Sequence, residues 1–325
     1  MAHIAIVGAT GMVGRQMLKS LEERAIRLKQ LTLYASKRSA GETLYFKGQP
    51  LVVKELNEDS IEPTIDVALF SAGAHTSLTF TPLFNALGIT VIDNSSAFRQ
   101  SDAPLVVPEV NKQAIKVNDR IVANPNCSTI QCVIPLHVLR TLSPLKRVLY
   151  STYQAVSGSG QKGVEALTNE TSLEDVNIYP KPIVHNVIPH IDTLLDDGYT
   201  KEEQKMRLET RKILGLETLS VSATCVRVPV MHGHAVSLTV TTEHPVDLSS
   251  LITAFKAHEA LIYHDHPHYP TPLEVAGEDM IHIGRLRRDL DDPNTLHFWC
   301  VADNIRKGAA TNAIQILEHL LEVPL

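Results

Sequence analysis

The chain opens with His3-Ile4-Ala5-Ile6-Val7-Gly8-Ala9-Thr10-Gly11-Met12-Val13-Gly14, a predicted strand, a glycine-rich turn and the start of a helix. Apolar residues continue at helical spacing to Glu23. Glycines at such a turn let backbone amides approach a pyrophosphate, and the helix N-terminus adds positive potential. Glycine turns occur at many strand–helix junctions, so the evidence for a binding loop is that the GxxGxxG stretch lies between the first predicted strand and the first predicted helix. It predicts a dinucleotide-binding loop made by Gly8, Thr10, Gly11, Met12 and Val13.

Working outward from this loop, short apolar runs alternate with amphipathic stretches over the first third of the chain. A helical stretch is expected after Ser71-Ala72-Gly73, up to Leu87, and a hairpin around Gly48-Gln49-Pro50. Alternation at this spacing is typical of a doubly wound parallel sheet, so a Rossmann-like domain is expected. The predicted strands are His3–Val7, Leu31–Ala35, Thr43–Phe46, Leu51–Val53, Asp66–Phe70, Ile89–Ile92 and Arg120–Ala123.

The pattern changes after Cys127. Two predicted strands, Leu219–Val228 and Ala235–Thr242, follow each other with no helical crossover, which favours an antiparallel or mixed sheet and an α+β second domain. The other predicted elements here are the strand Arg147–Val156 and the helices Ser128–Leu142, Val164–Thr171, Glu202–Leu214 and Gly308–Leu321. We expect residues 1–126 to bind the cofactor and residues 127–303 to carry catalysis and dimerisation. The C-terminal stretch 304–325 is expected to pack back on the first domain.

Length and composition place the chain among ordinary globular proteins. It has 325 residues, 44% hydrophobic and 20% charged, with a net charge of -6. No run of like charges points to nucleic acid or an anionic membrane as a partner. Neither a secretory signal nor an apolar stretch long enough for a bilayer is evident. Four cysteines without a CxxC pair indicate reduced thiols, so a cytoplasmic location is expected.

The turn after the second strand bears on the choice of cofactor. A protein that binds NAD places Asp or Glu there to accept from the ribose 2′-hydroxyl. This chain has Ala35-Ser36-Lys37-Arg38-Ser39 instead. Arg38 can bind a 2′-phosphate with two parallel hydrogen bonds, helped by Ser36 and Ser39. A solvated basic turn is the alternative interpretation; NADP is the prediction.

Cys127 stands at the predicted junction of a strand and a helix, in Asn124-Pro125-Asn126-Cys127-Ser128-Thr129. Pro125 ends the strand and Asn126 is a good N-cap. A cysteine in the first helical turn gains thiolate character from the free amides and the helix dipole, and the same amides can hold an oxyanion. A lone cysteine is more often a small buried side chain. That alternative suits Cys132, Cys225 and Cys300, which stand in apolar stretches.

A nucleophilic cysteine also needs a proton partner. Fifteen histidines make any one of them weak evidence, but His232-Gly233-His234 lies at a turn between two strands, shortly after Arg227. The small residues of Ser157-Gly158-Ser159-Gly160 end another strand and suit either a ligand or a plain loop. His264, His266 and His268 suggest a metal site only weakly, because Pro267 and the loop context favour a surface segment. No metal is predicted.

Together these residues resemble the aspartate-semialdehyde dehydrogenase family over nearly the whole chain. The most specific elements are the Pro-Asn-Cys-Ser-Thr segment and an arginine seven residues before a histidine. Met231-His232-Gly233-His234 looks like the branch with His-Gly-His, whereas another branch has Arg-Cys-His. The remaining matching stretches are Gly8–Gly14, Ser95–Arg99, Val107–Asn111, Gln154–Gly158, Arg227–His234 and Asn304–Asn312.

The resemblance implies a role for each matching residue. Cys127 is then the nucleophile, His234 the acid/base, and Gln154 orients the substrate near the thioester. Substrate binding falls to Asn126, to Arg227 for the α-carboxylate, to Glu202 for the α-ammonium, and to Arg99 and Lys205 for phosphate. Ser157, Gly158 and Asn304 lie near the nicotinamide. Without the resemblance, Glu202 and Lys205 read as an ordinary i,i+3 pair on a solvated helix.

The reaction that this implies is NADPH-dependent reduction of L-aspartyl-4-phosphate to L-aspartate 4-semialdehyde and phosphate, by a homodimer that serves lysine, threonine and methionine synthesis. Three alternatives stay open. N-acetyl-γ-glutamyl-phosphate reductase shares the chemistry, but its substrate lacks the ammonium that Glu202 would bind. A non-catalytic NADP-binding regulator needs neither Cys127 nor His234. A cysteine hydrolase leaves the Gly8–Gly14 loop without a role.

Overall fold

The computed structural model describes residues 1–168 and 178–322. The chain divides into two compact units, Met1–Pro125 with Ala309–Leu325, and Asn126–Gly308. Asn126 and residues 304–308 therefore group with the second unit, whereas the sequence analysis assigns them to the first domain. Within the described residues, every helix is too short or too polar to span a bilayer.

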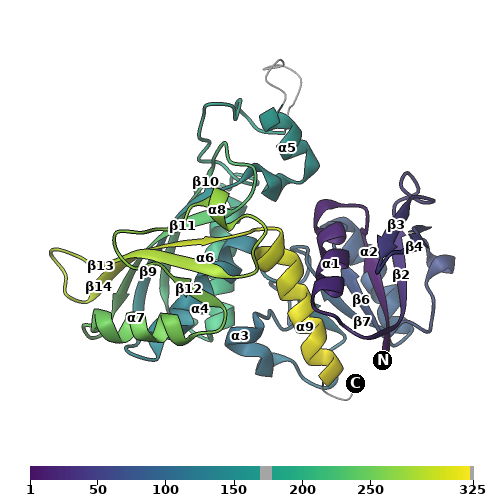
Figure 1. Ribbon diagram of the computed structural model, residues 1–325, viewed down its shortest axis with the longest axis horizontal. Coiled ribbons are helices and arrows are strands. Elements are labelled where there is room, and N and C mark those ends of the chain that lie inside the picture. The colour runs from purple at the N-terminus through teal and green to yellow at the C-terminus, as the bar shows by residue number, and fades with distance from the viewer. Residues whose placement is uncertain (169–177, 323–325) are drawn as a thin grey trace. The chain divides into compact units, whose positions relative to one another are not determined.

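The first unit is built on a six-stranded parallel sheet in the order β5-β2-β1-β6-β7-β8, of which Figure 1 labels β2, β6 and β7. Its strands are β1 (Ala2–Val7), β2 (Leu28–Ala35), β5 (Lys54–Glu55), β6 (Val67–Phe70), β7 (Thr90–Asp93) and β8 (Ile121–Ala123). The hairpin is formed by β3 (Thr43–Phe46) and β4 (Gln49–Val52). The predicted doubly wound fold and the hairpin are confirmed, with strand ends shifted by a few residues.

Alternation along the central strands gives this sheet two apolar faces. Ile4 and Ile6 pack with helices α1 (Met12–Glu23) and α9 (Thr311–Glu322), whereas Ala5 and Val7 pack on the side of α2 (Ala74–Ala86). Because successive strand residues point to opposite faces, β1 is buried on both sides. The C-terminal helix α9 thus belongs to the first unit, preceded by the π-helical turn η4 (Arg306–Ala310). The remaining elements of this unit are η1 (Glu58–Ser60), α3 (Pro108–Asn111) and η2 (Lys112–Ala114).

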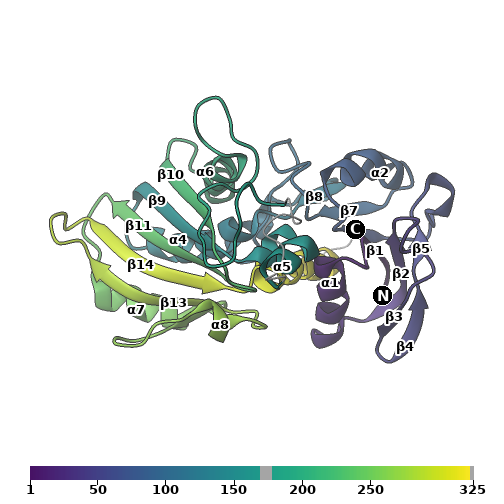
Figure 2. The ribbon, with the colours of Figure 1, turned by 90° about the horizontal axis from the view of Figure 1, so that it is seen from above.

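The second unit holds a six-stranded mixed sheet in the order β10-β9-β11-β14-β13-β12 (Figure 2). β9 pairs with β10 in parallel and with β11 in antiparallel orientation, so the predicted mixed sheet is confirmed. Helices α4, α6 and α7 pack on one of its faces. The strands are β9 (Leu145–Gln154), β10 (Ser220–Arg227), β11 (His234–Thr242), β12 (Leu261–Tyr263), β13 (Ile281–Arg288) and β14 (Thr295–Ala302). The helices are α4 (Cys127–Arg140), η3 (Val156–Ser159), α5 (Gln161–Thr168), α6 (Lys201–Leu214), α7 (Leu248–Ala257) and α8 (Pro272–Val275).

The sequence patterns predict no elements between Thr242 and Gly308, where the structure has α7, β12, α8, β13 and β14. β13 is interrupted by a register shift between Gly284 and Arg287, where Arg285 has a φ of +56°. A bulge of this kind breaks the regular alternation that marks a strand in a sequence. The predicted helix Val164–Thr171 is described as Gln161–Thr168, and the rest of that prediction lies outside the described residues.

Candidate active site

The glycine-rich loop after β1 is a close-packed backbone cradle in the first unit. A Cβ on Gly14 would lie 2.1 Å from the Gly8 carbonyl oxygen, and one on Gly8 would lie 2.5 Å from the Ser71 oxygen. Gly11 is the N-cap of α1 and supplies no side-chain capping hydrogen bond. The first amides of α1 therefore have no side-chain cap at this position, as an anion site at a helix N-terminus needs. The geometry fits a pyrophosphate; Thr10, Met12 and Val13 are half-buried in the same loop.

The turn after β2 lies beside this cradle, because β1 and β2 are adjacent parallel strands that end at the same sheet edge. The amides of Ser39 and Ala40 both donate to the Ser36 carbonyl, at 2.9 and 3.0 Å. Ser36 and Arg38 are exposed and Ser39 is half-buried. The turn thus presents a guanidinium and two hydroxyls next to a dinucleotide loop, and it presents no carboxylate.

Arg99 is also in the first unit, where it braces the chain that leads to the cysteine. It is only 8% exposed. Its Nε donates to the Asn124 carbonyl at 2.9 Å, and its Nη2 donates to the Asn94 carbonyl at 2.9 Å. Asn124 precedes Cys127 by three residues. These hydrogen bonds give Arg99 a structural role at the end of β8, in addition to the phosphate-binding role that the resemblance implies.

Cys127 is the first residue of α4, with Asn126 as its N-cap. The Asn126 side-chain oxygen accepts hydrogen bonds from the amides of Ser128 at 3.0 Å and Thr129 at 3.3 Å. Cys127 is partly exposed, whereas Cys132, Cys225 and Cys300 are buried. The two amides are already occupied by the cap, so they are not the free oxyanion donors that the sequence suggests.

Burial distinguishes the other cysteines chemically. It raises the pKa of the Cys132 thiol well above its ordinary value, and it also raises the pKa of Cys225. A thiolate, not a thiol, is the reactive form of cysteine. Buried Cys132 and Cys225 therefore stay protonated, while Cys127 stands at a polar helix start with access to solvent.

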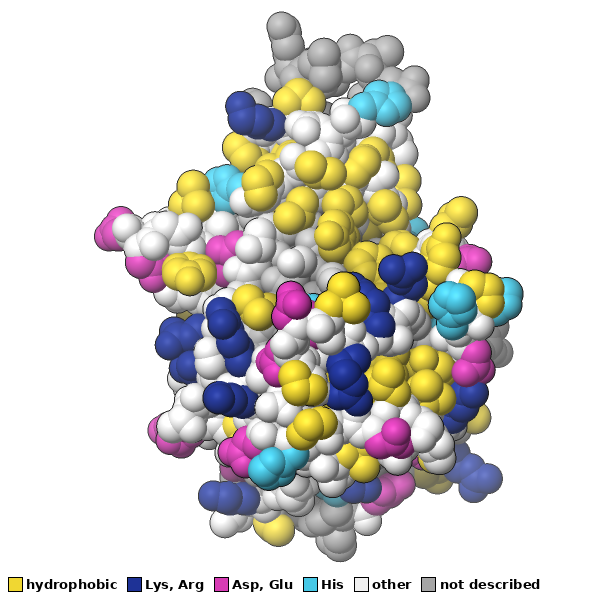
Figure 3. Space-filling view, turned by 90° about the vertical axis from the view of Figure 1, so that its left-hand side faces the viewer, with side chains coloured by type: hydrophobic (Ala, Val, Ile, Leu, Met, Phe, Trp, Pro, Cys, Tyr) yellow, Lys and Arg dark blue, Asp and Glu magenta, His cyan; other side chains and the backbone are white. Residues whose placement is uncertain are grey.

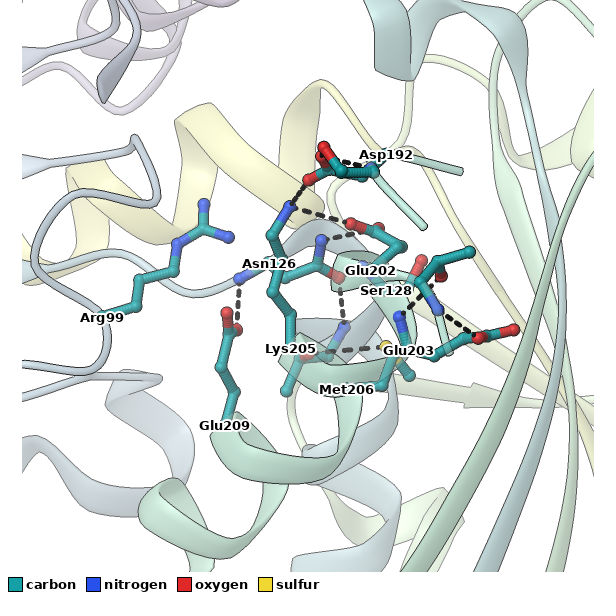
Figure 4. A network of polar contacts seen from close by, with 12 residues as sticks. Arg99, Asn126, Ser128, Asp192, Glu202, Glu203, Lys205, Met206 and Glu209 are labelled. Atoms are coloured by element: carbon teal, nitrogen blue, oxygen red, sulfur yellow. Dashed lines mark hydrogen bonds and ion pairs between the residues drawn. The ribbon is translucent and has the colours of Figure 1, made fainter. Parts of the chain in front are cut away.

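The carboxylate of Glu202 contacts three other predicted site residues (Figure 4). Its Oε1 accepts from Asn126 Nδ2 at 2.8 Å and from Gln154 Nε2 at 3.1 Å. Its Oε2 faces the ammonium of Lys205 at 3.2 Å. The structure thus brings together Asn126, Gln154, Glu202 and Lys205, drawn from α4, β9 and α6.

The interpretation of Glu202 and Lys205 as a solvated helix pair is wrong. The i,i+3 contact exists, but Glu202 is only 4% exposed. Burial alone would raise the pKa of this carboxyl, yet Lys205 and the two amide donors hold it below its ordinary value. A buried charge needs such partners to remain ionised. Glu202 is therefore a fixed negative charge inside the second unit.

His234 and Arg227 form a second buried pair, on the first residue of β11 and the last of β10. The Ala155 amide donates to His234 Nδ1 at 3.0 Å, and Arg227 Nη1 donates to the Ala155 carbonyl at 2.6 Å. Because Nδ1 accepts, the proton of the neutral ring is on Nε2. Burial, and then the nearby Arg227 charge, lower the pKa of His234 well below its ordinary value.

Two polar atoms of this pair have no hydrogen-bond partner within the described part of the chain, namely Arg227 Nε and His234 Nε2. Such atoms usually mark strain or a functional role, because a buried unsatisfied donor is costly. Gly158 lies directly against the pair: a Cβ there would be 2.8 Å from Arg227 Nη1 and 3.2 Å from His234 Nε2. Only glycine fits this approach.

Ser157 and Asn304 connect the same region to the turn before β11. Asn304 Nδ2 donates to Ser157 Oγ at 3.0 Å, and Asn304 Oδ1 accepts from the Gly233 amide at 3.0 Å. Both side chains are buried. The three predicted nicotinamide-side residues, Ser157, Gly158 and Asn304, thus lie around the His232-Gly233-His234 turn.

A cavity of about 380 Å³ opens beside Arg227. The Arg227 guanidinium carbon lies 5.8 Å from the centre of the Tyr179 ring, which lines the same cavity. Asp192, another lining residue, pairs with Lys205 at 2.6 Å. Arg227 on the wall of this small cavity suits a ligand that carries a carboxylate.

Asp192, Tyr179 and Glu209 are not predicted from the sequence. Glu209 Oε2 accepts from the Asn126 amide at 2.7 Å and so helps to place the N-cap of α4. One signal was available for it: Glu202, Lys205 and Glu209 recur at i, i+3 and i+7 along one helix face. Asp192 and Tyr179 lie in irregular segments, where no periodicity could point to them.

The histidine segment does not form a metal centre. His264 Nε2 lies 2.9 Å from His282 Nδ1, and His282 Nε2 lies 2.8 Å from Glu278 Oε2. His266 and His268 are exposed. Across residues 1–168 and 178–322, no group of three or more His, Cys, Asp or Glu side chains could hold a metal ion.

Two family descriptions match the chain in the same two parts. Residues 3–118 match the semialdehyde dehydrogenase, NAD binding domain, and residues 135–307 match the semialdehyde dehydrogenase, dimerisation domain. An aspartate-semialdehyde dehydrogenase of Aquifex aeolicus is 48% identical over 98% of each chain. One of Bacillus subtilis is 43% identical over 99% of this chain and 98% of its own.

A solved structure covers the whole chain. The crystal structure of aspartate semialdehyde dehydrogenase II complexed with ASA from Vibrio cholerae has a TM-score of 0.97 and 40% identity, over 100% of this chain and 99% of that one. Agreement at this level extends over both units. It joins the nucleotide-binding fold of the first unit and the cysteine-bearing second unit within one family of proteins.

Proposed function

The chain belongs to the semialdehyde dehydrogenase family, and from that premise we propose that it reduces L-aspartyl-4-phosphate to L-aspartate 4-semialdehyde with release of phosphate. The observation that carries this proposal is the capped Cys127 at the start of α4, whose cap residue is bound to the buried Glu202. A nucleophile, a buried carboxylate and a buried arginine belong to one unit of the chain.

NADP is the proposed cofactor. The Gly8–Gly14 cradle would hold the pyrophosphate, and Arg38 with Ser36 and Ser39 would hold the 2′-phosphate. The exposed guanidinium and the lack of a carboxylate in residues 36–39 support NADP over NAD. Ser157, Gly158 and Asn304 would border the nicotinamide. When bound in its reduced form, this cofactor supplies the hydride for the reduction.

Cys127 would perform the covalent steps. Its thiolate attacks the acyl carbon of the phosphorylated substrate, a C–S bond forms, and the bond from that carbon to the phosphate oxygen breaks. Phosphate leaves with the electron pair. The resulting thioester is a better hydride acceptor than a free carboxylate, which explains why a cysteine is used. Gln154, which donates to Glu202, would orient the acyl group.

His234 would act as the proton donor. Its ring carries hydrogen on Nε2, and that atom has no partner among the described residues. Nε2 can therefore donate to the thioester oxygen as negative charge develops there. With the Ser128 and Thr129 amides occupied by the N-cap, this imidazole is the best-supported oxyanion donor. Collapse of the thiohemiacetal then releases the aldehyde and returns the sulfur of Cys127.

The charges of the second unit fit the ends of the substrate. Arg227 would bind the α-carboxylate with two parallel hydrogen bonds, and Glu202 would bind the α-ammonium. Lys205, together with Arg99, would bind the phosphate. N-acetyl-γ-glutamyl phosphate lacks a free ammonium and would leave Glu202 without its ligand. The low pKa of the buried Glu202 carboxyl favours a cationic group and hence aspartyl phosphate.

A second copy of the chain is the proposed partner, and the cytoplasm the proposed location. The matched dimerisation domain spans residues 135–307 and includes the mixed sheet. Opposite its helices, the sheet carries half-buried or exposed side chains, among them Ser151, Tyr153 and Trp299. Figure 3 shows hydrophobic side chains gathered side by side on one face of the molecule. Such surface supports association between copies.

The test runs the reaction in reverse. Purified protein, aspartate 4-semialdehyde, phosphate and NADP should produce NADPH, followed by its absorbance, and phosphate should be required. N-acetylglutamate 5-semialdehyde in place of the aspartate compound should give about 10- to 100-fold lower kcat/KM, because its acetylated nitrogen is uncharged and loses a charge-assisted contact to Glu202 worth about 1.5–3 kcal/mol. Equal rates with the two aldehydes would contradict the substrate assignment. Turnover without phosphate would contradict the acyl-phosphate chemistry.

A further inference from the structure

The ammonium of Lys205 is already neutralised by two carboxylates. Asp192 Oδ2 lies 2.6 Å from Lys205 Nζ, and Glu202 Oε2 lies 3.2 Å from it (Figure 4). A lysine that is to hold a phosphate is expected to offer its charge to that phosphate. Here the resident anions outnumber the cation, so an incoming phosphate meets repulsion as well as attraction.

The two carboxylates differ in how firmly they are held. Glu202, with a side chain 6% exposed, receives hydrogen bonds from two amides in addition to Lys205. The Asp192 side chain is 33% exposed and lines the cavity beside Arg227. Besides its contact with Lys205, the Asp192 carboxylate accepts hydrogen bonds from the amide and hydroxyl of the next residue, Thr193. Asp192 is thus the anion that can leave.

The backbone around Asp192 is fixed, although its carboxylate is accessible. Asp192 has a φ of +67°, in the left-handed region. The Thr193 carbonyl accepts from the Lys201 amide at 2.9 Å, and Leu194 forms a bridge with Thr200. The segment is therefore anchored to the N-terminus of α6, the helix that carries Lys205. Burial alone would raise the pKa of Asp192, but Lys205 and Thr193 lower it, so the carboxylate is charged at neutral pH.

We propose that Asp192 is a built-in competitor of phosphate at Lys205. It occupies the lysine when no phosphoryl group is bound, and the phosphoryl group displaces it. This inference rests on the proposed function, which gives Lys205 its phosphate. By weakening the hold on phosphate, Asp192 eases the departure of that product.

Asp192→Asn separates charge from shape at this position. Asparagine tolerates a left-handed backbone and retains a side-chain oxygen for Thr193. We expect the KM for phosphate in the reverse reaction to fall about two- to fivefold, the range for a partly exposed ion pair. The KM for the semialdehyde should not change. Asp265→Asn is the matched control, because it breaks an exposed pair with Lys256, 2.8 Å apart, and removes the same charge.

Calorimetric titration with inorganic phosphate provides a readout that needs no turnover. Asp192→Asn should bind phosphate more tightly than the unaltered chain, and Asp265→Asn should match it. In a Lys205→Ala background, Asp192→Asn should no longer tighten phosphate binding, because there is no lysine for which Asp192 and phosphate compete. A phosphate affinity that is unchanged or weaker in Asp192→Asn would overturn the proposal.

Other outcomes remain distinguishable. If Asp192→Asn raises the KM for the semialdehyde and leaves phosphate unaffected, Asp192 recognises the substrate ammonium and the competitor role is wrong. If the unaltered chain makes no NADPH from aspartate 4-semialdehyde, the proposed function fails. In that case the titrations still decide whether Asp192 competes for Lys205.

Discussion

The glycine-rich loop of the first unit and the buried polar cluster of the second unit differ in which parts of the chain form them. The loop consists of backbone: glycines at positions 8 and 14 allow contacts that any Cβ would prevent, and the N-cap Gly11 contributes no side chain. The cluster consists of buried side chains. Gln154, Glu202, Arg227 and His234 come from four elements and Asn126 is the N-cap of a fifth, and together they span more than a hundred residues.

This difference determines what each region tolerates and how it can be tested. A backbone cradle depends on a short stretch of sequence and binds a group that many proteins share. A side-chain network depends on the fold of the whole unit, and each charge in it has a particular partner. Changes in the cluster should therefore alter chemistry, whereas changes at the rim of the cofactor region should alter affinity.

The strongest test of this contrast is removal of the nucleophile. Cys127→Ala should lower kcat at least about 1000-fold, since the covalent route is lost, and should leave NADP affinity unchanged. Steady-state rates and NADP titration measure the two effects. Cys132→Ala, in the same helix but buried, is the control and should retain turnover. Substantial activity in the purified Cys127 variant would refute the thioester.

Arg227→Lys tests whether geometry in the cluster matters beyond charge. Lysine keeps the positive charge but cannot make two parallel bonds to a carboxylate. A misplaced substrate can lose about 100-fold in rate, so kcat/KM for the semialdehyde should fall by about that factor. Arg207→Lys, on the exposed side of α6, should have no effect. If the two variants behave alike, Arg227 does not bind the carboxylate.

Arg38→Ala tests the other side of the comparison, the rim of the cofactor region. Loss of a charge-assisted contact should weaken NADP by about 1.5–3 kcal/mol, with little change for NAD. Lys37→Ala, one position away and also exposed, should affect both cofactors equally and weakly. Titration of each variant with both cofactors gives the answer. Equal losses for NADP and NAD in Arg38→Ala would remove the 2′-phosphate role.

The same contrast explains how much the sequence predicts. The loop and the parallel sheet can be predicted from the sequence because strand alternation, glycines and a helix start are local features. The position of Cys127 at a helix start can be predicted because its N-cap residue directly precedes it. The burial of Glu202 is not, because only the packing of α6 in the second unit turns its polar face inward. Without the family resemblance, the sequence predicts that Glu202 and Lys205 are surface residues.

Other parts fail for equally physical reasons. The strands after Thr242 are not predicted; in β13 the bulge at Arg285 interrupts the alternation. Asp192 lies in an irregular segment, and its partner Lys205 is thirteen residues away on a helix. The amides of α4 are predicted to be free for an oxyanion, but the N-cap that makes the helix start recognisable also occupies them.

The smallest expected effect concerns the buried His234 and the pH dependence of stability. Burial holds its pKa well below the ordinary value of about 6.5, so the folded chain keeps the ring neutral. The unfolded chain takes up a proton as the pH falls below about 6.5. The free energy of unfolding contributed by the neutral ring is therefore complete above that pH and declines below it. Between pH 7 and 5.5, the decline should be about 1 kcal/mol.

His234→Gln, which cannot titrate, should show a decline smaller by that amount in urea unfolding, and exposed His266→Gln should follow the unaltered chain. The other buried or half-buried histidines are common to all three proteins and cancel in the comparison. Parallel pH curves for His234→Gln and the unaltered chain would show that folding does not lower the pKa of His234, and the buried neutral ring would then be contradicted.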